Sequence, residues 1–189
     1  MKRLASLLMA LALLLAATAL AEPAAETTVL DLDDFTLTVP ANTVYETSDK
    51  ANNVVFMQLS SPTGSNSNLN CVWAEQPMDL ALYTQELFEL SAKPAIEASM
   101  EEAGIDMTNL TFAPIELKEL NGVPVLYAGY SYDADYSPLG YDLQLALNIS
   151  QFIASREDLG TYTFTITWIE DDTEAYQALM DIVDSVSWK

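Results

Sequence analysis

The stretch Thr161-Tyr-Thr-Phe-Thr-Ile-Thr-Trp168 alternates threonine with large apolar side chains without a break. Neighbouring side chains of a β-strand point to opposite faces, so this period of two predicts a strand with one apolar face and one threonine face. We expect the apolar face to pack on the core. The threonine face could meet a partner, but we expect it to lie beneath a helix that tolerates small polar residues.

The same alternation recurs along the chain and predicts an antiparallel sheet. Residues 141–149 alternate cleanly, but Phe152 is out of phase, which predicts a β-bulge near Ser150-Gln151. Asn121-Gly122 predicts a tight hairpin turn, because both central positions of that turn need a positive φ. The turn joins predicted strands at 110–119 and 123–132. Further strands are expected at 35–39, 53–60 and 68–75.

Two segments have the spacing of amphipathic helices. The first is expected to begin after Asp79 as its N-cap, to kink at Pro94 and to end at Gly104. Its predicted apolar face comprises Tyr83, Leu87, Leu90, Ile96, Met100 and Ala103. The second helix follows Asp171, with Tyr176, Leu179, Met180 and Val183 on its apolar face. The sequence therefore predicts an α+β domain with seven or eight antiparallel strands and two main helices.

The first 21 residues have the pattern of an export signal. Lys2 and Arg3 precede an apolar run from Leu4 to Ala17, and Ala19-Leu20-Ala21 fits a cleavage site. We expect a signal peptide at 1–21, a leader at 22–29 and one domain at 30–189. The alternative is an uncleaved membrane anchor. No cysteine at the cleavage site accepts a lipid, so we expect an extracellular or periplasmic protein of a bacterium, neither a lipoprotein nor inserted in the membrane after cleavage.

The composition is strongly acidic and limits the partners. The chain holds 28 acidic and 7 basic residues, a net charge of −21, which becomes −23 once Lys2 and Arg3 are removed. Nucleic acids and anionic lipids require clustered basic side chains, so neither is expected as a partner. The acids either form a solvated coat or attract basic partners. We expect a monomer.

The residues that common catalytic sites need are scarce. The chain contains no histidine, which removes the Ser-His-Asp and Cys-His arrangements and the usual zinc sites. The single cysteine, Cys71, alternates with Leu69 and Trp73 and is expected to be buried. Pairs of carboxylates that cleave glycosides stay open as an alternative, but 28 acids make such pairs common by chance.

One loop combines tyrosines and aspartates at close spacing, in residues 130–142. Three interpretations are open. Oxygen-bearing side chains at alternate positions are typical of calcium loops, and the candidate ligands are Asp133, Asp135 and Asp142. The rings of Tyr130, Tyr132, Tyr136 and Tyr141 would stack on a sugar or a peptide. The third interpretation is an ordinary hairpin loop without a ligand.

The order of elements resembles the PsbP-like fold, which Ran-binding Mog proteins and periplasmic DcrB-like lipoproteins share. The resemblance rests on Phe35-Thr-Leu-Thr-Val-Pro40, a long helix, three hairpin-linked strands and the final Asp181-Ile-Val-Asp-Ser-Val-Ser-Trp188. It spans about residues 30–188 and implies an α/β/α sandwich. It also implies a non-catalytic binding or accessory domain, but no binding motif of the family is present to carry over.

These observations together predict an exported binding or accessory domain without a cofactor, calcium excepted. Its partner would be an unidentified protein or glycan. Two alternatives stay open: a small carboxylate-dependent hydrolase, and an acidic protein that inhibits a basic target.

Overall fold

The computed structural model describes residues 26–47 and 55–189. The predicted signal peptide, residues 1–21, and residues 22–25 of the predicted leader lie outside this part of the chain. The strand β1 (Thr27–Asp31) begins inside the predicted leader. No helix in the described part is long and apolar enough to cross a membrane.

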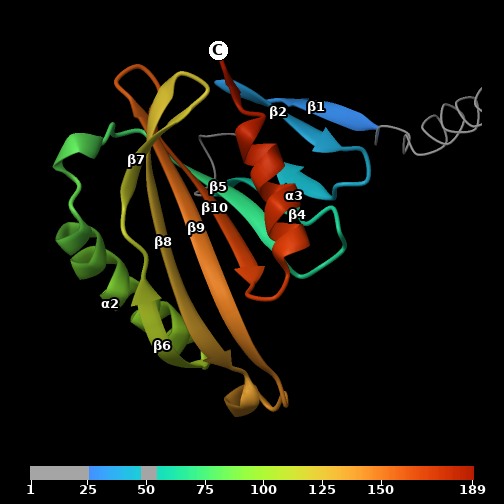
Figure 1. The fold of residues 1–189 in the computed structure, drawn as a ribbon, viewed down its shortest axis with the longest axis vertical. Coiled ribbons are helices and arrows are strands. Elements are labelled where there is room, and N and C mark those ends of the chain that lie inside the picture. Colours follow the sequence, from blue (N-terminus) through green and yellow to red (C-terminus); the bar gives the residue numbers. More distant parts are fainter. Residues whose placement is uncertain (1–25, 48–54) are drawn as a thin grey trace, which may run out of the picture.

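The described residues form two sheets and two α-helices (Figure 1). The large antiparallel sheet has eight strands: β3 (Tyr45–Thr47), β4 (Val55–Ser60), β5 (Asn68–Ala74), β10 (Gly160–Ile169), β9 (Gln144–Arg156), β8 (Val123–Asp135) and β6 (Asp106–Phe112) in spatial order, with β7 (Glu116–Leu120) beside β8. The small sheet contains β1, β2 (Phe35–Pro40) and β11 (Ser187–Trp188). The predicted α+β class is confirmed.

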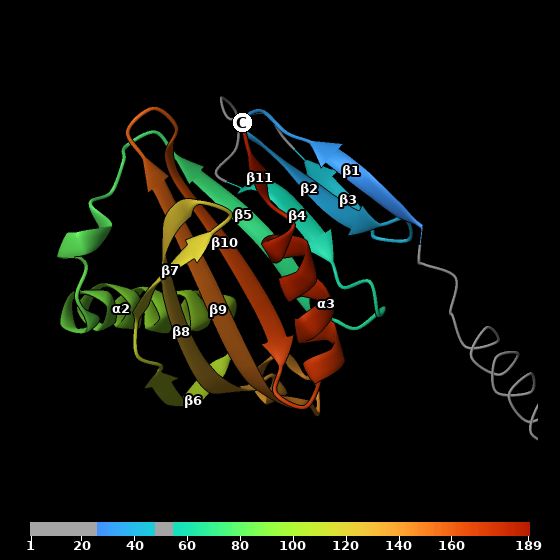
Figure 2. The ribbon, with the colours of Figure 1, turned by 45° about the horizontal axis from the view of Figure 1, so that its top comes forward.

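The helices cover opposite faces of the large sheet. Figure 2 shows α2 (Gln85–Ala103) crossing behind β8 and β9, and α3 (Thr173–Asp184) on the other face beside the small sheet. The main core lies under α3 and the small sheet. Phe35 is fully buried there, with its ring 5.3 Å from that of Tyr162 and 5.4 Å from that of Phe164. Cys71 is fully buried in the same core, as predicted.

The predicted bulge at Ser150-Gln151 is absent. β9 pairs with β8 from Gln144 to Ala154 and with β10 from Leu147 to Arg156, without a shift of register. Phe152 is out of phase with Ile149 because each packs on a different layer. Phe152 belongs to the main core, and Ile149 packs in a cluster with Met100 of α2. Because both faces of the sheet are covered, residues of either parity are buried.

The predicted strand at 110–119 is two strands, β6 and β7, separated by residues 113–115. The side chain of Gln85 bridges the gap. Its Oε1 accepts a hydrogen bond from the Ile115 N–H at 2.8 Å, and its Nε2 donates to the Ala113 carbonyl at 3.3 Å. One amide side chain thereby satisfies backbone groups that a continuous strand would have paired.

The first helix begins later and turns a different face inward than predicted. Asp79 caps the short 3₁₀ turn η1 (Leu80–Leu82), whereas Thr84 caps α2 by accepting from the Leu87 N–H. Leu87 and Leu90 are 48% and 71% exposed, and Phe88 is buried, edge-on to the ring of Phe112 at 5.6 Å. The aromatic contact fixes the rotation of the helix, so the leucines point outward.

The threonine face of β10 differs in part from the expectation. Thr161 is buried, and its hydroxyl donates to the carbonyl of Gln76, in the segment before η1. The other three threonines are half-buried. The buried threonine therefore lies against a connecting segment.

Candidate functional site

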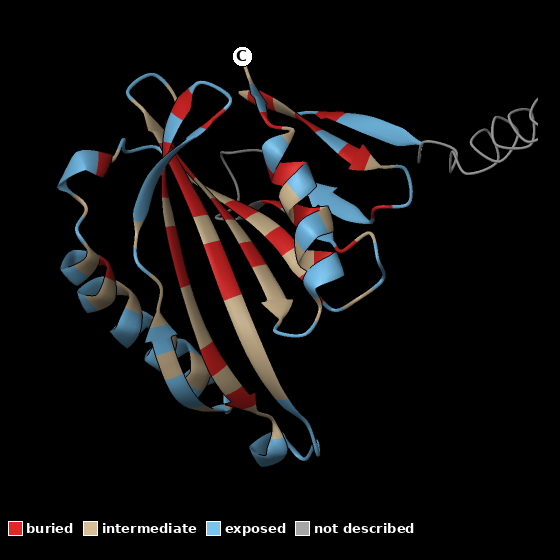
Figure 3. Cartoon of the chain, viewed as in Figure 1, coloured by how far each residue is buried: buried red, intermediate tan, exposed pale blue. Residues whose placement is uncertain are grey.

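The candidate site is the part of the large sheet that α3 leaves uncovered. β8 and β9 extend well beyond α3, and Figure 3 shows the far end of β9 as half-buried or exposed. At the far end of β8, buried residues that face α2 alternate with half-buried residues of the uncovered face. Directly paired residues of antiparallel strands share a face. The register therefore places ten side chains on one surface, here called the open face: Asp106, Thr108, Thr111, Ser131, Asp133, Asp135, Gln144, Ala146, Asn148 and Trp168.

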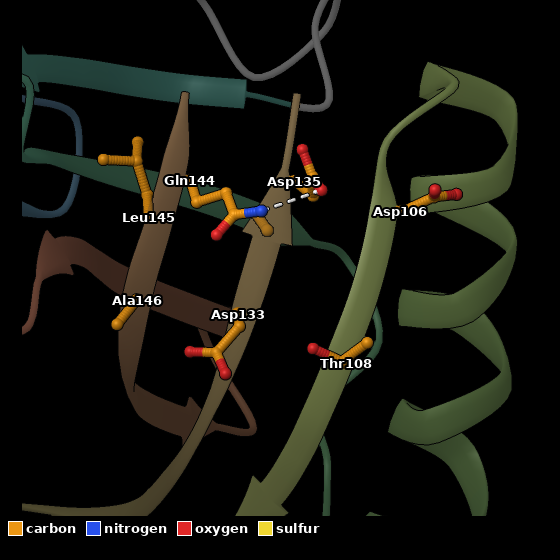
Figure 4. A pocket seen from close by; sticks show the side chains of 8 residues that line it. Asp106, Thr108, Asp133, Asp135, Gln144, Leu145 and Ala146 are labelled. Atoms are coloured by element: carbon orange, nitrogen blue, oxygen red, sulfur yellow. Dashed lines mark hydrogen bonds between the residues drawn. The ribbon is translucent and has the colours of Figure 1, made fainter. Parts of the chain in front are cut away.

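One end of the open face is a hollow of about 430 Å³ lined by five polar residues together with Ala134, Leu145 and Ala146. Figure 4 shows Asp133, Asp135 and Gln144 in it, with a hydrogen bond between the last two. The Ser137 side chain, and then the Ser137 N–H at 2.8 Å, hold the pKa of Asp135 below its ordinary value, with a smaller contribution from Gln144. Asp135 is therefore a stable anion on this surface.

The middle of the open face is organised by a bulge in β6. The register shifts between Thr108 and Thr111, and Asn109 between them has a positive φ of 55°. This conformation brings the Asn109 Nδ2 to within 2.6 Å of Asp133 Oδ2, to which it donates. Asn and Asp tolerate left-handed backbone better than most residues, which explains the asparagine. Glu170 lies beside Asp133 in the adjoining hollow of about 190 Å³.

The other end of the open face meets α3 and is aromatic. The Trp168 ring stacks on that of Tyr176 with a centroid distance of 4.6 Å and an angle of 28°. Trp168, Tyr176 and Tyr127 line a hollow of about 270 Å³. The indole N–H of Trp168 is buried and has no hydrogen-bond partner, which is a costly state for a donor.

Comparison with known proteins finds solved structures of similar fold, but no match to a family or to a curated protein by sequence. The solution structure of cyanobacterial PsbP (CyanoP) from Synechocystis is similar over 89% of this chain and 96% of its own, with a TM-score of 0.57 at 15% identity. The Saccharomyces cerevisiae Ran-binding protein Mog1p is similar over 87% of this chain and 96% of its own, with a TM-score of 0.50 at 13% identity.

The chain has a PsbP/Mog1-like fold. The resemblance drawn from the order of elements is therefore confirmed at the level of the fold. At 13–15% identity the likeness extends to the architecture alone. The site of this PsbP/Mog1-like domain must accordingly be argued from its own residues.

In this PsbP/Mog1-like fold, the three predicted calcium ligands do not lie together. Asp133 and Asp135 line the same hollow, whereas Asp142 is exposed in the loop beyond it and is not among the lining residues. Both hollow-lining aspartates are already hydrogen-bonded, to Asn109 and to Ser137 and Gln144. In the described part of the chain, no three acidic, cysteine or histidine side chains group closely enough to hold a metal ion.

The predicted tyrosines lie mostly on the opposite face from the aspartates. Tyr130 and Tyr132 pack with Met100 of α2, and their rings stack at 6.3 Å. Burial raises the pKa of Tyr130 to about 12, and the neighbouring Tyr132 adds to the shift. Tyr136 also packs in this cluster, and Tyr141 is 64% exposed in the loop. The four rings do not form a single stacking surface.

The sequence interpretation missed the residues that other strands contribute. Asn148 and Trp168 pair directly across β9 and β10, and Tyr176 reaches them from α3. None of the three stands out locally, because each lies in a regular strand or helix pattern. The only usable indication was the alternation in residues 130–135, which places odd and even residues on opposite faces.

Proposed function

We propose that this protein is an exported, non-catalytic binding or accessory domain that holds its partner on the open face. One observation carries the proposal: three adjacent strands present a continuous polar surface, with an aromatic end, that α3 leaves uncovered. Polar side chains that converge on a concave surface beside aromatic rings are typical of binding sites. The predicted export signal at residues 1–21 favours a partner outside the cytoplasm.

The state of the candidate catalytic groups favours binding over hydrolysis. A catalytic acid needs a pKa raised toward neutrality, whereas the pKa of Asp135 is lowered. Burial raises the pKa of the Cys71 thiol well above its ordinary value, so the thiolate needed for nucleophilic attack is disfavoured. The lowered pKa therefore disfavours Asp135 as the acid of a carboxylate mechanism, and the raised pKa disfavours Cys71 as a nucleophile.

Site-specific crosslinking in the organism that encodes the protein tests the proposal. A photoreactive residue, p-benzoyl-phenylalanine, replaces Asn148 on the open face or, in the control, Glu97 on the exposed side of α2. We expect a discrete adduct from position 148 and none from position 97. A second change, Ala146→Trp, places a large side chain in the hollow of about 190 Å³ that Ala146 and Asn148 both line. It should remove the adduct, because it blocks the surface next to position 148.

Three results would contradict the proposal: no adduct from position 148, equal adducts from both positions, or an adduct that persists in the Ala146→Trp background. Circular dichroism of each variant verifies that the fold is intact. The readout does not depend on the chemistry of the partner.

A further inference from the structure

The open face has the dimensions of an extended polypeptide segment. From Gly129 to Asp135, β8 covers about 20 Å at about 3.4 Å per residue. The three hollows follow one another along this length, with Tyr127 and Gly129 at one end and Asp135 at the other. A segment of about six extended residues would fill the surface.

All the charged side chains that line the three hollows are acidic. They are Asp106, Asp133, Asp135 and Glu170. No lysine or arginine is among the lining residues of the three hollows. At the aromatic end, the Nζ of Lys118 lies 4.0 Å from the ring centroid of Tyr127 and is paired with Glu116 at 3.2 Å. The open face is therefore complementary to positive charge.

The carboxylates are spaced to meet side chains of an extended segment. Asp133 and Asp135 are two residues apart on β8 and point to the same face, about 7 Å apart along the strand. An extended peptide has the same repeat, because every second side chain points the same way. Lysine or arginine at alternate positions would meet successive carboxylates.

The aromatic end supplies the group that a peptide backbone needs. The buried indole N–H of Trp168 has no acceptor, and a carbonyl of an incoming segment would provide one if the ring turns outward as the segment binds. The ring of Trp168 is stacked on Tyr176, so one of its faces is already occupied. This arrangement suits a backbone acceptor at the edge of the ring better than a sugar ring, which needs a free aromatic face.

From these observations we infer that the open face binds an extended segment of a partner protein that carries lysine or arginine at alternate positions. The inference rests on the proposed function and adds the chemistry of the partner. Asp133, Asp135 and Glu170 pair with the basic side chains, and the Trp168 N–H, exposed by a turn of its ring, donates to a backbone carbonyl of the segment.

Calorimetric titration of the purified protein with two synthetic peptides tests the inference. The probe is an octapeptide of alternating lysine and threonine, and its control replaces each lysine by glutamine. The open-face variant combines Asp133→Asn, Asp135→Asn and Glu170→Gln. A matched variant removes three charges from exposed positions of α2, with Glu86→Gln, Glu101→Gln and Glu102→Gln. Thermal unfolding confirms that each variant folds.

We expect the lysine peptide to bind saturably. The open-face variant should bind it about tenfold more weakly or worse, because each of the three lost ion pairs contributes about threefold. The α2 variant should weaken it by less than the open-face variant, because α2 covers the opposite face of the large sheet and its carboxylates cannot pair with a peptide on the open face (Figure 2). Trp168→Phe, which keeps a ring but removes the N–H, should weaken binding about threefold or more. The glutamine peptide should bind at least about tenfold more weakly than the lysine peptide.

Equal losses in the two triple variants, or no saturable binding of the lysine peptide, would overturn the inference. If neutral chitohexaose binds instead and Ala146→Trp abolishes that binding, the open face is a glycan site. The inference then fails while the proposed function stands. Failure of the crosslinking at position 148 as well would remove both.

Discussion

The side-chain amide of Asn121 donates a hydrogen bond to the carbonyl of Asp184 at 2.9 Å and also donates to the carbonyl of Val186. These contacts fasten the turn between β7 and β8 to the end of α3, 63 residues further along the chain. Asn121 has a positive φ of 49°, so the same residue shapes the turn and supplies the contact. This attachment adds to the core packing of Leu179, Ile182 and Val183 in holding the end of α3 against the large sheet.

Asn121→Ala should destabilise the protein by about 2–3 kcal/mol, because it removes two hydrogen bonds and places alanine at a positive φ. Asn121→Gly is the control, since glycine keeps the backbone conformation and removes only the hydrogen bonds. It should cost about 1–2 kcal/mol. Urea unfolding followed by tryptophan fluorescence measures both. A loss below about 0.5 kcal/mol in the alanine variant would show that the attachment does not matter.

Gly160, at the start of β10, should tolerate no side chain. Its φ is +83°, and a Cβ there would collide with the carbonyl of Ala74 and come within 3.0 Å of the carbonyl of Glu75. Gly140 has a similar φ of +88° with nothing within 4 Å, so it separates backbone strain from collision. We expect Gly160→Ala to cost about 3 kcal/mol or more and Gly140→Ala about 1 kcal/mol, measured by thermal unfolding. Equal costs would refute the collision.

Tyr130 should make the protein sensitive to alkali. Burial raises its pKa from 10.0 to about 12, so between these values the unfolded chain has lost a proton that the folded chain retains. Stability is then complete below pH 10 and declines as the pH rises to about 12, by at most about 2.7 kcal/mol for this residue. Tyr130→Phe should reduce the decline without removing it, because burial also raises the pKa values of Tyr132, Tyr162 and Tyr176. Tyr141→Phe, at an exposed site, should leave the decline unchanged. Urea unfolding at several pH values compares them, and identical declines in all three proteins would contradict the assignment.

The parts of the fold that the sequence predicted have local causes. The alternation in residues 161–168 and the Asn121-Gly122 turn, whose φ angles are 49° and 84°, depend on neighbouring residues only. The bulge at Ser150-Gln151 was predicted because one buried face was assumed. Both faces of the sheet are in fact covered, so residues of either parity can be buried without a bulge. Only the positions of α2 and α3 show this, and no local sequence pattern specifies them.

The candidate site was predictable only where it lies on a single strand. The interval 130–135 contains Tyr130, Tyr132, Asp133 and Asp135. Strand parity alone separates the even tyrosines from the odd aspartates, so the sequence already held the reason that they cannot form one surface. Trp168 joins the aspartates through the pairing of β9 with β10, which no local pattern specifies.

Calcium should not saturate this protein at concentrations below about 1 mM, the weak end of extracellular calcium modules. Asp133 and Asp135 accept hydrogen bonds that a calcium ion would have to replace, and Asp142 is not among the residues that line their hollow. Calorimetric titration with calcium chloride measures the binding, and the double variant Asp133→Asn with Asp135→Asn is the control. Tighter, saturable binding that the double variant abolishes would establish a calcium loop. A bound calcium ion would then neutralise Asp133 and Asp135 and compete with a basic segment of a partner for them.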